Sequence, residues 1–229
     1  MSTAWIVILG IAGLLFVMRK AIVRIFALLF LRQAIRAGLG DVGRAALEKL
    51  DVKITLAPEE GYSWKNDGVE ERYVRPLLDL GFSEAGAYSV DQMPGVHIQM
   101  LVHVKDRIHA NVFEHPVAGN WLELVSRREN DEVFTVTDLQ PQGVDRPEWL
   151  HAFEVEKTVP VASMVQRLVQ ERKSGRFKPI PRQTAKDEFE RGYARFMAWK
   201  KSAGISPEEV ARQIQRRLAS TDDSLATRR

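Results

Sequence analysis

The sequence contains no cysteine among its 229 residues, which excludes a disulfide framework, a thiolate zinc site, an iron–sulfur cluster and a cysteine nucleophile. It also lacks any strong compositional bias. Apolar residues make up 45% and charged residues 28% of the chain, close to the averages of folded proteins. Wholesale disorder and collagen-like or coiled-coil repeats are therefore excluded. The length is enough for one ordinary domain with appendages, or for two small domains.

Charge is absent from the first eighteen residues, and residues 4–18 form an uninterrupted apolar run, AWIVILGIAGLLFVM. As a helix this run spans about 22 Å, and the uncharged residues before it and the long side chains of Arg19 and Lys20 extend it toward the ~30 Å hydrocarbon core. We therefore predict a transmembrane anchor over residues 1–20. A cleaved signal peptide would instead carry its positive charge before the apolar run. A buried soluble helix would need a larger core than the remaining chain offers.

The net charge of +3 hides an uneven distribution along the chain. Residues 1–50 hold seven Lys/Arg against two Asp/Glu, residues 51–160 hold ten against twenty, and residues 161–229 hold sixteen against eight. No cation precedes the apolar run, whereas several follow it closely. The positive-inside rule then predicts a single-pass protein with its N-terminus outside and its C-terminal domain in the cytoplasm.

Residues 21–50 are predicted to form a basic interfacial helix and a neck. Lys20, at the end of the anchor, and three arginines of this segment recur at multiples of four residues, which places them on one slowly turning stripe of a helix; the arginines are Arg24, Arg32 and Arg36. Such a stripe would contact anionic lipid headgroups. Two alternatives remain open, because the segment could also continue the membrane helix or pack against another subunit. Residues 38–43 match GxGxxG, but no strand precedes them, so we interpret them as the flexible neck.

Two glycines inside the anchor predict a possible helix-packing face. Gly10 and Gly13 lie three residues apart and share a side of the helix. Small residues let another backbone approach closely within a membrane, where the hydrophobic effect no longer drives association. The spacing is GxxG rather than GxxxG, so a glycine pair that is merely tolerated in a lipid-facing helix is the alternative.

The fold class that we predict is α+β: an N-terminal membrane helix, an antiparallel β-meander packed on helices, and a C-terminal helical hairpin. The cytoplasmic α+β domain spans residues 51–173. Its predicted helices cover 69–80, which Pro76 would kink or divide, and 161–173. Its predicted strands alternate apolar and polar residues between turn signals; they cover 52–56, 87–92, 96–104, 108–115, 120–127, 132–139 and 152–158.

The C-terminal third is predicted to hold a basic linker (174–183), the helical hairpin (184–219) and a disordered tail (220–229). Thr184 with Asp187 suggests a capping box for the first helix, and Ser206 is the expected cap of the second. Three hypotheses explain the positive charge of this region: anionic lipid, docking against the acidic sheet or a partner, and nucleic acid. Because no nucleic-acid-binding motif accompanies the charge, we do not expect nucleic acid as a partner.

Four of the five histidines fall on two adjacent predicted strands. A three-residue loop at 105–107 would place apolar residues opposite each other on one face, with Met100, Val102 and Val112 facing the core. The opposite face would then pair His103 with His109 and His97 with His115. The two pairs would lie about 20 Å apart and could not form one four-ligand site. We therefore expect this face to be solvated or covered by a partner. A metal-binding or proton-linked role for its histidines is the alternative.

Acidic residues near the histidines could form an acid–base cluster, although nothing in their spacing requires one; they are Glu114, Glu123 and Asp138, beside His115. Because acidic residues are abundant here, chance proximity is the default interpretation. We therefore predict no catalytic, cofactor-binding or metal-ligating residue. The sequence favours a non-catalytic accessory or scaffold subunit that binds a membrane protein partner or complex. A membrane-tethered enzyme using a His/Glu-bearing sheet face is the alternative.

Overall fold

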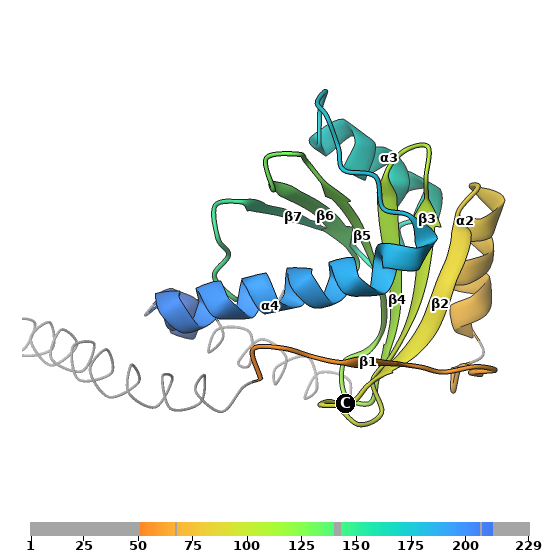
Figure 1. Cartoon of the computed structure of the whole chain (residues 1–229), viewed down its shortest axis with the longest axis horizontal. Coiled ribbons are helices and arrows are strands. Elements are labelled where there is room, and N and C mark those ends of the chain that lie inside the picture. Colours follow the sequence, from red (N-terminus) through yellow and green to blue (C-terminus); the bar gives the residue numbers. More distant parts are fainter. Residues whose placement is uncertain (1–50, 67, 140–142, 207, 213–229) are drawn as a thin grey trace, which may run out of the picture.

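The computed structural model describes residues 51–66, 68–139, 143–206 and 208–212 (Figure 1). The predicted anchor (1–20), the basic helix and neck (21–50) and the tail (220–229) lie outside these residues. The cationic stripe and the glycine pair Gly10 and Gly13 therefore stay predictions. Among the described helices, none is both long enough and apolar enough to cross a membrane.

The described residues form an α+β fold around one seven-stranded sheet, whose strands follow each other in chain order (Figure 1). The strands are β1 (Leu56–Pro58), β2 (Ser83–Val90), β3 (His97–His103), β4 (Ile108–His115), β5 (Gly119–Arg127), β6 (Val133–Thr137) and β7 (Leu150–Glu154). Neighbours from β1 to β6 are antiparallel, which confirms the predicted meander for these strands. The last pair, β6 and β7, is parallel. Turn residues mark where a strand stops but not the direction in which the next one runs.

Helices pack on both faces of the sheet. The described helical elements are η1 (Glu70–Val74), α2 (Arg75–Asp79), α3 (Val161–Glu171), η2 (Arg182–Thr184) and α4 (Ala185–Ala203). The first two continue into each other, and the helix changes from π to α geometry next to Pro76, which lacks the N–H that would continue the ladder. Because the helical backbone runs on through Val74 and Arg75 without a break, Pro76 does not divide the helix, and the alternative of a kink stays a prediction.

Two separate apolar clusters lie on the two faces of the sheet. On the first face, η1, α2 and α3 cover β3 to β6 with residues such as Leu77, Leu124 and Met164. On the second face, α4 and the segment before it cover β1 to β4 around Met100 and Phe113. Residues 174–183 carry the chain from one face to the other, because Phe177 belongs to the first cluster and Ile180 to the second. The sheet is thus covered on both faces and is not half-buried.

The predicted register of the β3–β4 hairpin is wrong by one residue. His103 pairs with Ile108, so four residues form the loop, and Arg107 adopts a positive φ of 56° within it. His97 and His103 therefore lie on the first face, and His109 lies on the second. Val112 likewise faces away from Met100 and Val102, although all three are buried. Because both faces are covered by apolar elements, matching polarity across the hairpin could not fix its register.

The described part of the C-terminal hairpin agrees with the sequence in its helices but not in both caps. Helix α4 ends before Gly204, and residues 208–212 are helical again. The Oγ of Ser206 accepts a hydrogen bond from the N–H of Glu209 at 3.0 Å, which confirms the second cap. The capping box of the first helix is wrong, because the hydroxyl of Thr184 donates to the carbonyl of Pro181. That hydroxyl is used in the turn before the helix.

Part of the basic C-terminal region docks on the acidic region of the same chain. The Nζ of Lys178 lies 2.6 Å from a carboxylate oxygen of Asp131, and Arg195 donates to the carbonyl of Asp131 at 2.7 Å. Arg212 forms an ion pair with Asp145. These contacts support the docking hypothesis for these cations, whereas lipid and nucleic acid stay untested.

Candidate functional site

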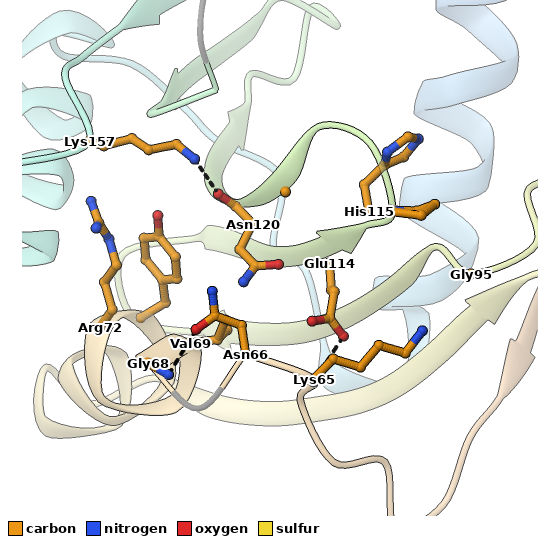
Figure 2. A pocket seen from close by; sticks show the side chains of 13 residues that line it. Lys65, Asn66, Gly68, Val69, Arg72, Gly95, Glu114, His115, Asn120 and Lys157 are labelled. Carbon is orange, nitrogen blue, oxygen red and sulfur yellow. Dashed lines mark hydrogen bonds between the residues drawn. The ribbon is translucent and has the colours of Figure 1, made fainter. Parts of the chain in front are cut away.

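A hollow of about 540 Å³ opens beside the first face of the sheet, where the β4–β5 turn meets the segment before η1 (Figure 2). We call it the basic basin. Its polar lining comes from four places in the chain: the loop before η1, η1 itself, the start and end of the β4–β5 turn, and the segment after β7. Its lysine, arginine, glutamate and asparagine side chains are Lys65, Asn66, Arg72, Glu114, Asn120 and Lys157.

Local hydrogen bonds shape the two loops that line the basic basin. Asn66 accepts the N–H of Gly68 on its side chain at 3.1 Å and that of Val69 on its carbonyl at 3.1 Å, which turns the chain into η1. In the β4–β5 turn, Nδ1 of His115 accepts the N–H groups of Val117 and Ala118, each at 3.0 Å. Both walls are therefore set by local side-chain bonds to the backbone.

Three cations line the basin within a domain that is otherwise acidic. Lys157 donates from Nζ to the carbonyl of Asn120 at 3.0 Å, which holds its ammonium group at the rim. The side chain of Arg72 is 43% exposed, and its guanidinium lies 3.8 Å from the carboxylate of Asp138. Lys65 lies on the other side, where its N–H donates to Glu114 at 3.3 Å (Figure 2). Each cation comes from a different part of the chain.

The carboxylates near the basin are already engaged in hydrogen bonds. Glu114 also accepts the hydroxyl of Tyr62. Asp138 is buried, and it accepts the N–H of Leu122 at 2.7 Å and the hydroxyl of Tyr73 at 2.5 Å. Burial and this carboxylate raise the pKa of Tyr73 well above its ordinary value, so its hydroxyl stays a donor. Tyr73 thus links the wall of the basin to the buried Asp138.

The structure brings together only part of the acid–base group considered from the sequence. Glu114 and His115 line the basic basin, and Asp138 lies behind Tyr73. Glu123 lies on the second face, where it is opposite Asn111. Sequence reasoning missed the three cations of the basin, because Lys157 is far from Lys65 and Arg72 in the chain and only the fold brings it to the same hollow.

Three of the four strand histidines have hydrogen-bond partners in the fold, and the fourth, His109, is buried. His97 Nδ1 lies 2.6 Å from Glu59, and its ring stacks on Tyr62. His103 accepts the N–H of Asp106 at 3.1 Å, and His115 accepts the two N–H groups of its turn. His109 is buried at 3% exposure, which corrects the expectation that it lies on a solvated or partner-covered face. Burial, with a contribution from Arg127, lowers its pKa to about 4.

A second polar group lies on the sheet face toward α4, and we call it the polar sheet cluster; it comprises His109, Asn111, Glu123 and Thr135. The hydroxyl of Thr135 donates to Glu123 at 3.2 Å. Burial raises the pKa of Glu123, against the opposing effect of this bond. Among the described residues, His109 Nε2 and Asn111 Oδ1 have no hydrogen-bond partner.

In comparisons with known proteins, the chain matches no protein family, no curated protein and no solved structure. Within the described ranges, no group of three or more His, Asp or Glu side chains is placed so that it could hold a metal ion.

Proposed function

We propose that this chain is a non-catalytic, single-pass membrane protein whose cytoplasmic α+β domain is an accessory or scaffold subunit of a membrane-associated complex. The apolar run of residues 4–18 and the cations that follow it support the anchor and its orientation. The cationic stripe after the anchor would contact anionic lipid headgroups, and a membrane protein partner would contact the chain in or below the bilayer.

The observation that carries the non-catalytic part is where the four strand histidines lie in the fold. The enzyme alternative rested on a sheet face that carries histidines and glutamates together. The observed register divides these histidines between the two faces. His97, His103 and His115 have partners in loops, and His109 is buried. The contacts of His97, His103 and His115 give these three histidines a structural role that needs no reaction.

One observation favours the enzyme alternative, namely the unpartnered His109 Nε2 and Asn111 Oδ1 beside Glu123. Elemental analysis of the full chain, purified in a mild detergent, tests its metal-dependent form. Stoichiometric bound metal that is lost in His109→Gln would favour the enzyme. If the His109→Gln variant keeps the metal, the metal is bound outside the polar sheet cluster.

Topology is tested by reporter fusions after Arg229. Because the positive charges follow the apolar run, we expect a cytoplasmic reporter to be active and an exported one to be silent. The reverse pattern would overturn both the orientation and the lipid contact of the cationic stripe.

The subunit role is tested by co-purification of the full chain from a mild detergent, where a partner at fixed stoichiometry is expected. Replacing Gly10 and Gly13 by leucine keeps the anchor hydrophobic but removes the close-packing face. We expect association to fall while membrane localisation stays. The matched control is Ala12→Leu, which lies on another side of the helix. If association survives the double change, the partner binds the cytoplasmic domain, and if no partner appears at fixed stoichiometry the subunit role is wrong.

A further inference from the structure

The basic basin concentrates positive charge at one place in an acidic region of the chain. Residues 51–160 hold ten Lys/Arg against twenty Asp/Glu, yet three of the ten cations, Lys65, Arg72 and Lys157, line this one hollow. Acidic surroundings would draw these side chains into ion pairs on the surface. Glu114 in the lining and Asp138 beside Arg72 offset part of this charge, but both carboxylates already accept hydrogen bonds from the chain, and a bound anion would offset the rest.

The donors in the basin are oriented and only partly used. Arg72 has five N–H donors, is 43% exposed, and has one described carboxylate neighbour, Asp138, at 3.8 Å. Lys157 has three donors and uses one of them on the carbonyl of Asn120. Figure 2 shows the side-chain amides of Asn66 and Asn120 pointing toward each other across the basin. Charged and neutral donors thus approach from several directions.

We propose that the basic basin binds a phosphate group, carried by a small soluble molecule or by a lipid headgroup. A phosphate group presents several terminal oxygens in a tetrahedral arrangement, which suits donors on different sides, whereas a carboxylate has two oxygens in one plane. Arg72 and Lys157 would supply the charged contacts, and Asn66 and Asn120 the neutral ones. The proposal concerns the described domain and does not rest on the membrane anchor or the subunit role.

The volume of the basin that a phosphate group leaves unfilled indicates what else the ligand carries. The volume of about 540 Å³ is in the usual range for small-molecule sites, ~300–1,000 Å³, and exceeds what one phosphate group fills. Glu114 lies beside Lys65 on the far side of the basin (Figure 2). The bonds from Tyr62 and Lys65 both go to its Oε2, so Oε1 would accept a hydrogen bond from a hydroxyl or amine of the ligand. A phosphomonoester with a polar body, such as glycerol 3-phosphate or its lipid equivalent, fits these features.

The test measures amide hydrogen exchange in the full chain in nonionic detergent, at constant ionic strength, over residues 64–73 and 115–120. The probes are inorganic phosphate, glycerol 3-phosphate and mixed micelles with phosphatidic acid, with chloride and acetate as reference anions. We expect slower exchange with a phosphate probe than with either reference. Protection by the soluble probes identifies a soluble ligand, and protection by phosphatidic acid alone identifies a lipid headgroup. No protection by any probe, or equal protection by acetate, would overturn the proposal.

Variants locate the effect in the basin. We expect Arg72→Gln and Lys157→Gln each to weaken phosphate binding about tenfold, the usual size of one charge-assisted hydrogen bond. The matched controls remove the same charge outside the basin. Arg75 lies one turn along the helix and pairs with Glu71 at 3.3 Å, and Lys105 is exposed in the β3–β4 loop, at the end of β4 opposite the basin. Arg75→Gln and Lys105→Gln should bind normally. Equal weakening in controls and basin variants would mean a general charge effect and would overturn the assigned site.

Discussion

The two faces of the sheet differ in what they bury. The first face, under η1, α2 and α3, is filled by apolar side chains from β3 to β6. The second face is apolar over β1 to β4, but its centre holds the polar sheet cluster, with His109 and Asn111 fully buried. Close packing of apolar groups stabilises at any pH, whereas buried polar groups contribute according to their partners and protonation. We expect stability to come mainly from the first face and pH sensitivity from the second.

The largest expected effect comes from adjacent residues of β5 that face opposite ways. Leu124 is fully buried in the cluster of the first face, and Val125 is half-buried on the second. We expect Leu124→Ala to lower the free energy of unfolding by about 2–5 kcal/mol and Val125→Ala by about 1 kcal/mol. Urea unfolding of the full chain in detergent, followed by tryptophan fluorescence, measures both. Equal losses would show that the faces contribute alike.

The next largest effect is the pH dependence that His109 gives to the free energy of unfolding. Its pKa is lowered to about 4 by burial, below the ordinary 6.5, so the unfolded chain binds a proton that the folded chain rejects. The stability contribution is complete above pH 6.5 and falls as the pH drops toward 4, by about 3 kcal/mol in total. We expect His109→Gln to remove this part of the pH dependence. His103→Gln is the control on the first face.

Glu123 titrates in the same cluster with the opposite sign. Its raised pKa means that the folded chain binds the proton more readily, so this group lowers stability as the pH rises past 4.5. The His109 effect is therefore best measured in a Glu123→Gln background as well. A pH profile that His109→Gln leaves unchanged in both backgrounds would contradict the assignment.

A smaller effect is expected from the buried hydrogen bond between Tyr73 and Asp138 on the first face. Tyr73→Phe removes the hydroxyl that donates to buried Asp138 and leaves that carboxylate with its bond from the N–H of Leu122 and the more distant Arg72. We expect a loss of about 1–2 kcal/mol in the free energy of unfolding. The control is Tyr88→Phe, whose half-buried hydroxyl donates to the carbonyl of Ala85 at 3.1 Å, and it should cost less. A larger loss in the control would show that the Asp138 bond contributes little.

The smallest effect tests how closely α4 sits over the second face. A methyl group added at Gly192 would lie 3.4 Å from the end of the Arg127 side chain, which is an ordinary contact with a flexible group. Gly192→Ala should therefore raise the free energy of unfolding by about 0.5–1 kcal/mol through helix propensity alone. A decrease, seen in the same urea experiment, would indicate that α4 packs more tightly there.

Much of the fold followed from local patterns. Alternation of polarity located β3, β4 and β5 within a residue or two, and apolar periodicity located α3 and α4. The cap at Ser206 could also be predicted, because a serine three residues before an acid satisfies the first free N–H groups of a helix. Thr184 shows the limit of that pattern, since a competing carbonyl at Pro181 takes its hydroxyl.

The sequence by itself determined the α+β class, the order of strands and helices, the charge segregation and the apolar N-terminal run, because each depends on residues close together in the chain. Only the tertiary structure decided the β3–β4 register, the parallel β7, the separation of His103 from His109 and the basic basin. Coverage of the second face by α4 makes both faces of the hairpin a buried environment, so local polarity cannot choose between registers. Lys65, Arg72 and Lys157 line the same hollow only because the sheet and the helices pack together, and no local sequence pattern predicts this arrangement.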